Sequence, residues 1–217
     1  MAMNIFSSTK KRIAEDHNTC EITRNGLVFI PDISGFTQLV AGTSLITGKN
    51  ITYELLATII RNNTLDMEIA EIEGDAVFFF KWQALPGTDE IRDQFNRLKI
   101  AFDQKTAELE ERYHIPLDLE LKAVAHYGAM AEFSLGGFRK LYGEVVVEAH
   151  RLLKNNVPKR SYLLITDELT AASARANQQL IPKDQGSSIG LCQIYEGLRS
   201  ICYTYTLFER HVVLISQ

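Results

Sequence analysis

A run of apolar residues that ends at a carboxylate constrains this chain more than any other stretch. Residues 27–35 read LVFIPDISG. The four consecutive apolar residues predict a buried strand, and Ser34-Gly35 after Asp32 predicts a turn into a helix. Asp32 then has two interpretations: it ligates a metal ion, because divalent ions such as Mg²⁺ take carboxylate oxygens, or it only caps the helix. A second acidic turn later in the chain bears on this choice.

This second turn is Glu73-Gly74-Asp75, which separates two apolar segments. Residues 65–72 and 76–82 are predicted to be the two strands of a hairpin, since Gly has the conformational freedom that a tight turn needs. The apolar alternation is interrupted at residues 71–73, which indicates a β-bulge. Pairing this hairpin with the strand before Asp32 would bring the carboxylates of Asp32 and Asp75 together.

Helices and hairpins alternate through the rest of the chain. A long helix is predicted from Thr88 to the residues before Pro116, and its many charged residues are expected to form a solvated face. Strands are predicted at 117–124, 129–135, 161–165 and from 189 onward, with a helix at 144–155. The order predicts an α+β fold: a ferredoxin-like βαββαβ sheet with helices on one face, plus C-terminal strands. We expect residues 1–24 to be an N-terminal extension and residues 25–217 to be a single domain.

Composition and charge argue against several classes of protein. Of 217 residues, 46% are hydrophobic and the net charge is −4, so the chain lacks the basic footprint of a nucleic-acid-binding protein. No apolar run reaches the length that spans a bilayer, and residues 1–12 do not resemble a secretory signal, so we expect a cytoplasmic protein with no membrane partner. The cysteines, Cys20, Cys192 and Cys202, are odd in number and widely spaced, which predicts reduced thiols rather than a disulfide framework or a zinc site.

Three segments, in order and with compatible spacing, resemble the motifs of class III nucleotide cyclase catalytic domains. FIPDISGFT at 29–37 resembles the family's F-x-D-I-x-G-F-T, and EIEGDA at 71–76 resembles its E/K-x-x-G-D-x hairpin. HYG at 126–128, YG at 142–143 and AHR at 149–151 together resemble its H-x-G … G-x-x-V-N-x-A-x-R stretch. The resemblance covers residues 25–208. It identifies the chain as a divergent, stand-alone member of that superfamily, similar to a family in it that is known only as a domain of unknown function.

The resemblance implies a two-ion site that binds Mg²⁺ or Mn²⁺ and a nucleoside triphosphate. Asp32 and Asp75 would be the metal carboxylates, with the backbone carbonyl of Ile33 as a further ligand. Hard oxygen ligands suit these ions, which activate a 3′-hydroxyl and neutralise a triphosphate. Arg151 would be the catalytic arginine that stabilises charge at the α-phosphoryl group. Backbone N–H groups at the start of the following helix would bind phosphate, namely those of Ser34, Gly35, Phe36 and Thr37.

The resemblance also assigns the selection of the base to Glu71 and Lys140, with two outcomes left open. Glu71 would accept hydrogen bonds from guanine N–H groups while Lys140 donates to a carbonyl oxygen. Alternatively, the two side chains form a salt bridge that fills an empty base pocket. The pair therefore does not decide between ATP and GTP.

Two departures from the family pattern bear on activity. The family's ribose-binding asparagine is Val147 here, which cannot hydrogen-bond, and the lysine expected on a late strand is replaced by Glu196, whose charge repels phosphate. Arg199 or Lys183 would be the residues to compensate. His126 is predicted to be a strand residue with a satisfied ring rather than a general base.

Two functions from different classes follow. The first is a nucleotide cyclase, a phosphorus–oxygen lyase that forms a cyclic nucleotide from ATP or GTP. It would act as a head-to-tail homodimer, in which Asp32 and Asp75 of one chain face Glu71, Lys140 and Arg151 of the other. The second is a catalytically inactive cyclase-like module that dimerises or senses a purine nucleotide. Both involve a second copy of the chain, the first requires a purine nucleoside triphosphate, and neither requires nucleic acid.

Overall fold

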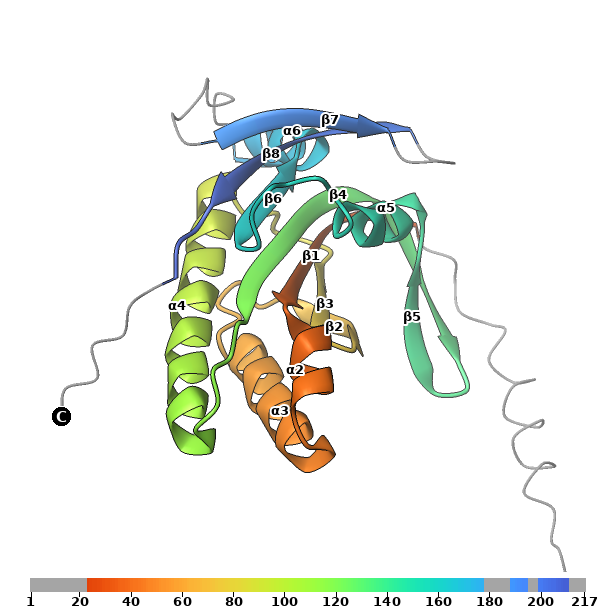
Figure 1. The fold of residues 1–217 in the computed structure, drawn as a ribbon. Coiled ribbons are helices and arrows are strands. Elements are labelled where there is room, and N and C mark those ends of the chain that lie inside the picture. The colour runs from red at the N-terminus through yellow and green to blue at the C-terminus, as the bar shows by residue number, and fades with distance from the viewer. Residues whose placement is uncertain (1–22, 178–187, 195–198, 211–217) are drawn as a thin grey trace, which may run out of the picture.

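The fold is seen in a computed structural model, which describes residues 23–177, 188–194 and 199–210 (Figure 1). The strands are β1 Arg24–Ser34, β2 Glu68–Glu73, β3 Ala76–Lys81, β4 Glu120–Leu135, β5 Phe138–Tyr142, β6 Tyr162–Thr166, β7 Ser188–Ile194 and β8 Ser200–Leu207. The helices are α2 Phe36–Gly42, α3 Leu45–Arg61, α4 Thr88–Tyr113, α5 Glu144–Leu152 and α6 Asp167–Ala176. In this part of the chain no helix combines the length and the apolar character needed to cross a membrane.

The strands form one sheet in the order β2-β3-β1-β4-β6-β8-β7, and β5 pairs only with β4. β1 lies between β3 and β4 and is antiparallel to both. β4 and β6 are parallel, and α5 lies in the connection between them. The predicted α+β class and ferredoxin-like arrangement are confirmed. The predicted bulge in β2 is present, but it lies between Ile69 and Glu71 rather than after Glu71.

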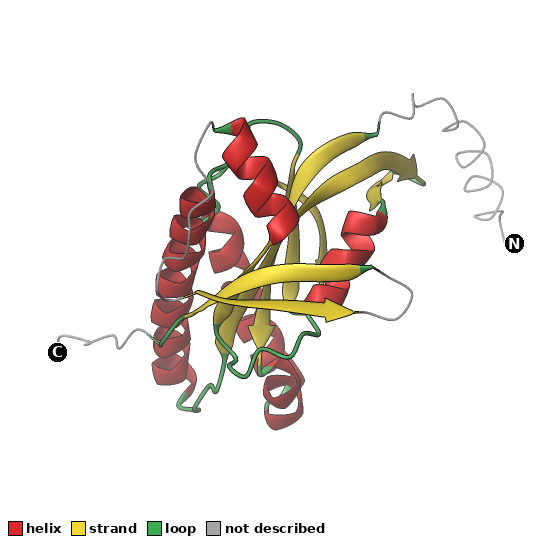
Figure 2. Cartoon of the chain, turned by 90° about the horizontal axis from the view of Figure 1, so that it is seen from above, coloured by secondary structure: helices red, strands yellow, loops and turns green. Residues whose placement is uncertain are grey.

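Helices cover both faces of this sheet (Figure 1 and Figure 2). Helices α3, α4 and α6 pack on the face that carries Leu27 and Phe29 of β1. Helix α5 packs on the opposite face, which carries Val28 and Ile30. The sequence predicted helices on one face, and the structure adds α5 on the other face. Since successive residues of a strand point to opposite faces, the unbroken apolar run 27–30 reflects a strand that is covered on both sides.

Helix α4 does not have a wholly solvated charged face. Lys99 is fully buried, and its ammonium donates hydrogen bonds to both carboxylate oxygens of Asp103, at 2.6 and 2.7 Å. A carboxylate oxygen of Glu120, at the start of β4, lies 3.2 Å from the same ammonium. Burying a charge is costly unless it is paired, and this pairing explains how the helix can pack a lysine against the sheet.

Strand β4 continues past the sheet and carries a hairpin arm, residues 131–142, in which it pairs with β5. The sequence predicted a break at Gly128, but Gly128 lies inside the strand. A Cβ at this position would lie 3.0 Å from the Cβ of Val145 in α5, so glycine allows the helix to pack closely against the strand. The arm stands away from the rest of the molecule in Figure 1 and exposes large apolar side chains, namely Phe133, Leu135, Phe138 and Tyr142.

The prediction of reduced thiols is wrong for two of the three cysteines. Cys192 of β7 and Cys202 of β8 form a disulfide. The hairpin register places these residues directly opposite one another. Their spacing along the sequence cannot reveal this pairing unless the register is already known. Cys20 lies outside the described residues.

The single tryptophan, Trp82, follows β3 at the base of the arm. The guanidinium of Arg24 lies over its ring, 4.9 Å from the ring centroid. The ring of Phe80 packs edge-on against it at 5.5 Å. Trp82 thus packs where β1 begins, and a Cβ on Gly26 would also meet both Trp82 and Met130 of β4.

Candidate functional site

The predicted carboxylate pair lies together at one end of the sheet. Asp32 is opposite Ala76 in the β1–β3 ladder, and the backbone N–H of Ile33 donates to the carbonyl of Asp75 at 3.2 Å. The turn that carries Asp75 depends on Gly74, which has a φ of 62°. Asp32, Ile33 and Asp75 all line a cavity of about 530 Å³. Strand pairing thus places the two acidic turns side by side, as their sequence positions indicated.

The two carboxyl groups lie where negative charge is poorly compensated. Burial raises the pKa of Asp32 above its usual value, against the opposing effect of Lys122. Burial also raises the pKa of Asp75, and the neighbouring charge of Asp32 raises it further. The Lys122 ammonium lies 3.4 Å from a carboxylate oxygen of Asp32 and donates to the carbonyl of Leu153 at 3.3 Å. One lysine therefore faces two partly buried carboxylates, a set that suits a divalent cation.

The oxygen donors fit the ions that the resemblance implies. Asp32 and Asp75 supply hard carboxylate oxygens. Ile33, whose backbone carbonyl is the further predicted ligand, lines the same cavity. Mg²⁺ or Mn²⁺ bound there would be held by these residues. A second group of ligand atoms, from Glu71, Glu73 and His150, lies within 4.8 Å of one another. In this group Glu71 pairs with the ammonium of Lys140 and Glu73 lies 3.2 Å from His150, which makes the aspartate pair the stronger candidate for a cation site.

The segment predicted to bind phosphate lies on the same cavity. Its turn requires Gly35, which has a φ of 95°, and a Cβ there would lie 2.4 Å from the carbonyl oxygen of Asp118. The Ser34 hydroxyl donates to the carbonyl of Arg160 at 3.1 Å. This contact ties the segment to the start of β6. The cavity-lining residues of the segment include the four predicted ones, Ser34, Gly35, Phe36 and Thr37.

Basic residues line the cavity as well. Arg151 lines it, in the same chain as Asp32, together with Lys122, His150 and Lys154. His150 Nδ1 donates to the carbonyl of Val146 at 2.9 Å, and Nε2 lies 3.2 Å from a carboxylate oxygen of Glu73. Sequence reasoning missed the last three of these basic residues. For Lys122 the missing information was its register, since it lies directly opposite Asp32 in the β1–β4 ladder.

The residues predicted to select a base form the salt bridge that was one of the two alternatives. The ammonium of Lys140, in the arm, pairs with the carboxylate of Glu71 in β2. The pair joins the arm to the edge of the sheet. In this arrangement both side chains bind one another rather than facing an open base pocket.

Arg199 is one of the two residues that were expected to compensate for the departures from the family pattern. It does not line the cavity. Its guanidinium donates to the carboxylate of Glu148 in α5, at 2.8 and 3.0 Å, and pairs with Glu168 in α6. Val147 is half-exposed on α5. Lys183 and Glu196 lie outside the described residues.

His126 has a satisfied ring, as predicted. It is fully buried, with Nε2 at 2.7 Å from Glu148 and Nδ1 at 2.8 Å from the Thr166 hydroxyl. The hydrogen bonds from His126 and Arg199 outweigh burial and lower the pKa of Glu148 to about 2. This network anchors α5, and with it Arg151, to β4 and β6.

The whole arrangement is similar to solved class III cyclase structures. The adenylyl cyclase CyaB from P. aeruginosa matches with a TM-score of 0.59 and 18% identity, over 88% of this chain and 98% of that one. A class III adenylyl cyclase-like ATP-binding protein from Pseudomonas aeruginosa matches with a TM-score of 0.61 and 17% identity, over 74% of this chain and 37% of that one. At this identity the likeness shows the fold, which is that of the class III cyclases.

A curated sequence relative and a family model also match the chain. The uncharacterized protein Rv2561/Rv2562 of Mycobacterium tuberculosis (strain ATCC 25618 / H37Rv) is 32% identical over 113 residues, or 46% of this chain. The match covers 50% of that protein, so the chain spans about half the length of this relative. The profile of a family described as "Protein of unknown function (DUF2652)" matches residues 52–162.

Proposed function

The chain belongs to the DUF2652 family of proteins of unknown function, and from this premise and its cavity we propose that it binds a purine nucleoside triphosphate together with Mg²⁺ or Mn²⁺. One observation carries the proposal. Asp32 and Asp75 line a cavity that Lys122 and Arg151 also line. A cavity lined by both carboxylates and cationic side chains suits a ligand that is a metal–phosphate complex.

The roles of the residues follow from their chemistry. Asp32 and Asp75, with the Ile33 carbonyl, hold the cation, which when bound neutralises phosphate charge and acidifies a coordinated hydroxyl. The backbone of residues 34–37 and the ammonium of Lys122 bind the phosphate chain. Arg151 offers a planar guanidinium to the same chain, where it would stabilise developing charge at phosphorus.

Turnover to a cyclic nucleotide is a second step that the chain supports less well. Val147 removes a hydrogen-bonding side chain from α5, and Glu71 and Lys140 bind one another. These two observations favour the alternative of a catalytically inactive nucleotide-binding module. One of the similar Pseudomonas structures is that of a cyclase-like protein described as ATP-binding, which is consistent with this alternative.

Calorimetric titration tests the binding proposal. The ligands are the α,β-methylene analogues of ATP and GTP with Mn²⁺, since these cannot cyclise. Asp32→Asn and Asp75→Asn are expected to weaken binding at least about 10-fold, because each removes a charged ligand of the cation. Asp89→Asn, on the exposed start of α4, is the matched control and should bind like the parent. Equal affinities for the parent and both site variants would refute the proposal.

A product assay separates the enzyme from the module. Purified protein is incubated with ATP or GTP and Mn²⁺, and cyclic nucleotide is quantified against the Asp32→Asn/Asp75→Asn double variant. Product above that background establishes a cyclase, and Arg151→Ala should then reduce the rate by about 10²-fold or more. Binding without product establishes the module.

A further inference from the structure

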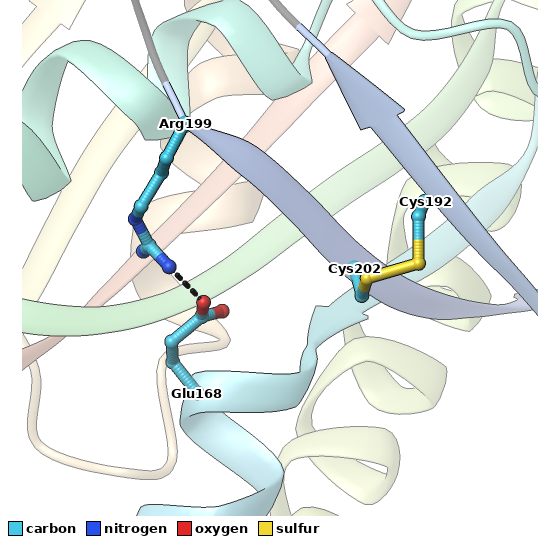
Figure 3. The surroundings of a disulfide bond; sticks show 4 residues. All are labelled: Glu168, Cys192, Arg199 and Cys202. Atoms are coloured by element: carbon cyan, nitrogen blue, oxygen red, sulfur yellow. Dashed lines mark hydrogen bonds and ion pairs between the residues drawn. A yellow bond between two sulfur atoms is a disulfide. The ribbon is translucent and has the colours of Figure 1, made fainter.

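The β7–β8 hairpin at the edge of the sheet is fastened by a disulfide between its two strands (Figure 3). Cys192 is exposed and Cys202 is half-buried, so a thiol in solution can reach the disulfide. β7 is an edge strand that pairs along its length with β8. Ile189 and Leu191 are largely exposed, and the Tyr203 hydroxyl donates to Gln193 at 3.1 Å.

β8, by contrast, is anchored by its inner face. Ile201, Tyr203 and Tyr205 are buried in a cluster that includes Leu152 of α5. The disulfide therefore does not hold β8 in the sheet. It fixes β7 to β8 and closes a covalent ring through residues ten apart in sequence, which lowers the conformational freedom of the enclosed chain.

Arg199 lies inside that ring, three residues before Cys202. Its guanidinium reaches out of the hairpin to Glu148 of α5 and to Glu168 of α6. Figure 3 shows it directed at Glu168, with the disulfide farther along the hairpin. Glu148 is buried on α5. It follows Val147, precedes Ala149 and lies one helical turn before Leu152. Arg199 is thus a polar tie, beside the apolar cluster that includes Leu152, between the hairpin and the helix that carries His150 and Arg151 to the cavity.

We propose that Cys192 and Cys202 are a reversible redox pair that sets how firmly Arg199 holds α5, and so tunes ligand binding in the cavity. The effect on ligand binding rests on the proposed function, whereas the redox pair and its effect on α5 do not. Reduction requires a dithiol reductant. One thiolate attacks a sulfur of the disulfide to form a mixed disulfide, and the second thiolate then releases the protein. The protein gains two electrons and two protons as two thiols, and the reductant is oxidised to its disulfide.

Hydrogen exchange followed by mass spectrometry tests the effect of the redox pair on α5. Peptides from β7–β8 and from α5 are compared in air-oxidised and dithiothreitol-reduced protein. We expect exchange in both regions to be about 10-fold faster after reduction, because the hairpin and its tie to α5 open more often. Cys192→Ser/Cys202→Ser should show the fast exchange with or without reductant. Cys20→Ser should behave like the parent.

Two further measurements test the redox pair and its effect on α5. Arg199→Gln in oxidised protein should speed exchange in α5 while leaving β7 protected, which separates the tie from the disulfide. Alkylation and peptide mapping of oxidised protein should find Cys192 joined to Cys202. Free thiols at both positions after oxidation, or unchanged α5 exchange on reduction, would overturn the redox pair.

Titration of the Mn²⁺–nucleotide analogue in both redox states tests the effect on ligand binding. Affinity is expected to fall about 3-fold or more on reduction, and to be insensitive to reductant in the double serine variant. Equal affinity in the two states overturns the regulatory role. If the analogue does not bind in either state, the proposed function has failed, and exchange in α5 still decides whether the redox pair exists.

Discussion

Lys122 shows how one residue can set the electrostatics of the cavity. Its ammonium lies 3.4 Å from a carboxylate oxygen of Asp32 and is fixed by the Leu153 carbonyl. Its positive charge therefore repels a metal cation bound at Asp32, while the same charge attracts a phosphate group. The same side chain opposes the bare ion and favours the ion–phosphate complex.

Lys122→Met should shift these two affinities in opposite directions. Removing the ammonium is expected to tighten Mn²⁺ alone by about 5-fold, since roughly 1 kcal/mol of repulsion at a partly exposed site is lost. Binding of Mn²⁺ with the nucleotide analogue should weaken, because a phosphate ligand is lost. Both are measured by calorimetry, with Lys159→Met as a control outside the cavity. Parallel changes in the two affinities would contradict this role.

Glu148 makes a second prediction at the residue scale, about stability and pH. Its pKa is about 2 in the folded protein against a usual 4.5, so its hydrogen bonds to His126 and Arg199 stabilise the fold above pH 4.5. This contribution, about 3 kcal/mol, is lost as the pH falls from 4.5 towards 2. Glu148→Gln should therefore be less stable at pH 7, and its deficit should shrink across that window.

Urea denaturation at a series of pH values checks this expectation. Glu144→Gln, on the exposed side of the same helix, is the control and should follow the parent. A deficit for Glu148→Gln that stays constant from pH 7 to pH 3 would mean that the carboxylate charge is not the cause.

At the scale of the elements, sequence patterns predicted what depends on local chemistry. Alternation, turn glycines and the proline after α4 predicted the hairpin around Asp75 and the long helix. What they missed depends on tertiary neighbours. Gly128 reads as a break until Val145 is packed against it, and Cys192 and Cys202 read as unrelated until the register of β7 and β8 is known. Lys99 likewise reads as a surface residue until Asp103 and Glu120 surround it.

The buried lysine of α4 gives a prediction for that element. Lys99→Met should destabilise the protein by about 3–5 kcal/mol, because Asp103 and Glu120 lose their shared cation in a buried position. Lys99→Met/Asp103→Leu should recover part of the loss, since it removes one of the two carboxylates that share the ammonium of Lys99. Denaturant unfolding measures both variants. An exposed change on the same helix, Lys105→Met, sets the scale for a surface lysine, and a loss no larger than this would contradict the buried pair.

At the scale of the whole molecule, the arm is the feature that a single chain leaves unexplained. Its apolar side chains are exposed on a hairpin that extends from the body, and patches of this kind mark association surfaces. A second copy that packs on the arm would bury them.

Phe138→Asp/Leu135→Asp is expected to shift the protein from dimer to monomer in sedimentation velocity, because the charges would be buried in the interface. The control is Leu45→Asp, which changes an apolar residue on α3 that is even more exposed than the two arm residues. It should leave the dimer intact. If the α3 change dissociates the dimer and the arm change does not, the interface lies on α3.

Trp82 provides an optical readout for these experiments. It is the only tryptophan in the sequence, and it packs against Arg24 and Phe80 where β4 leaves the sheet for the arm. Its emission therefore senses the polarity and rigidity of that junction, and not of the distant β7–β8 hairpin. Loss of the central sheet, and any tightening of the arm when two chains meet, can be followed by intrinsic fluorescence in the unlabelled protein.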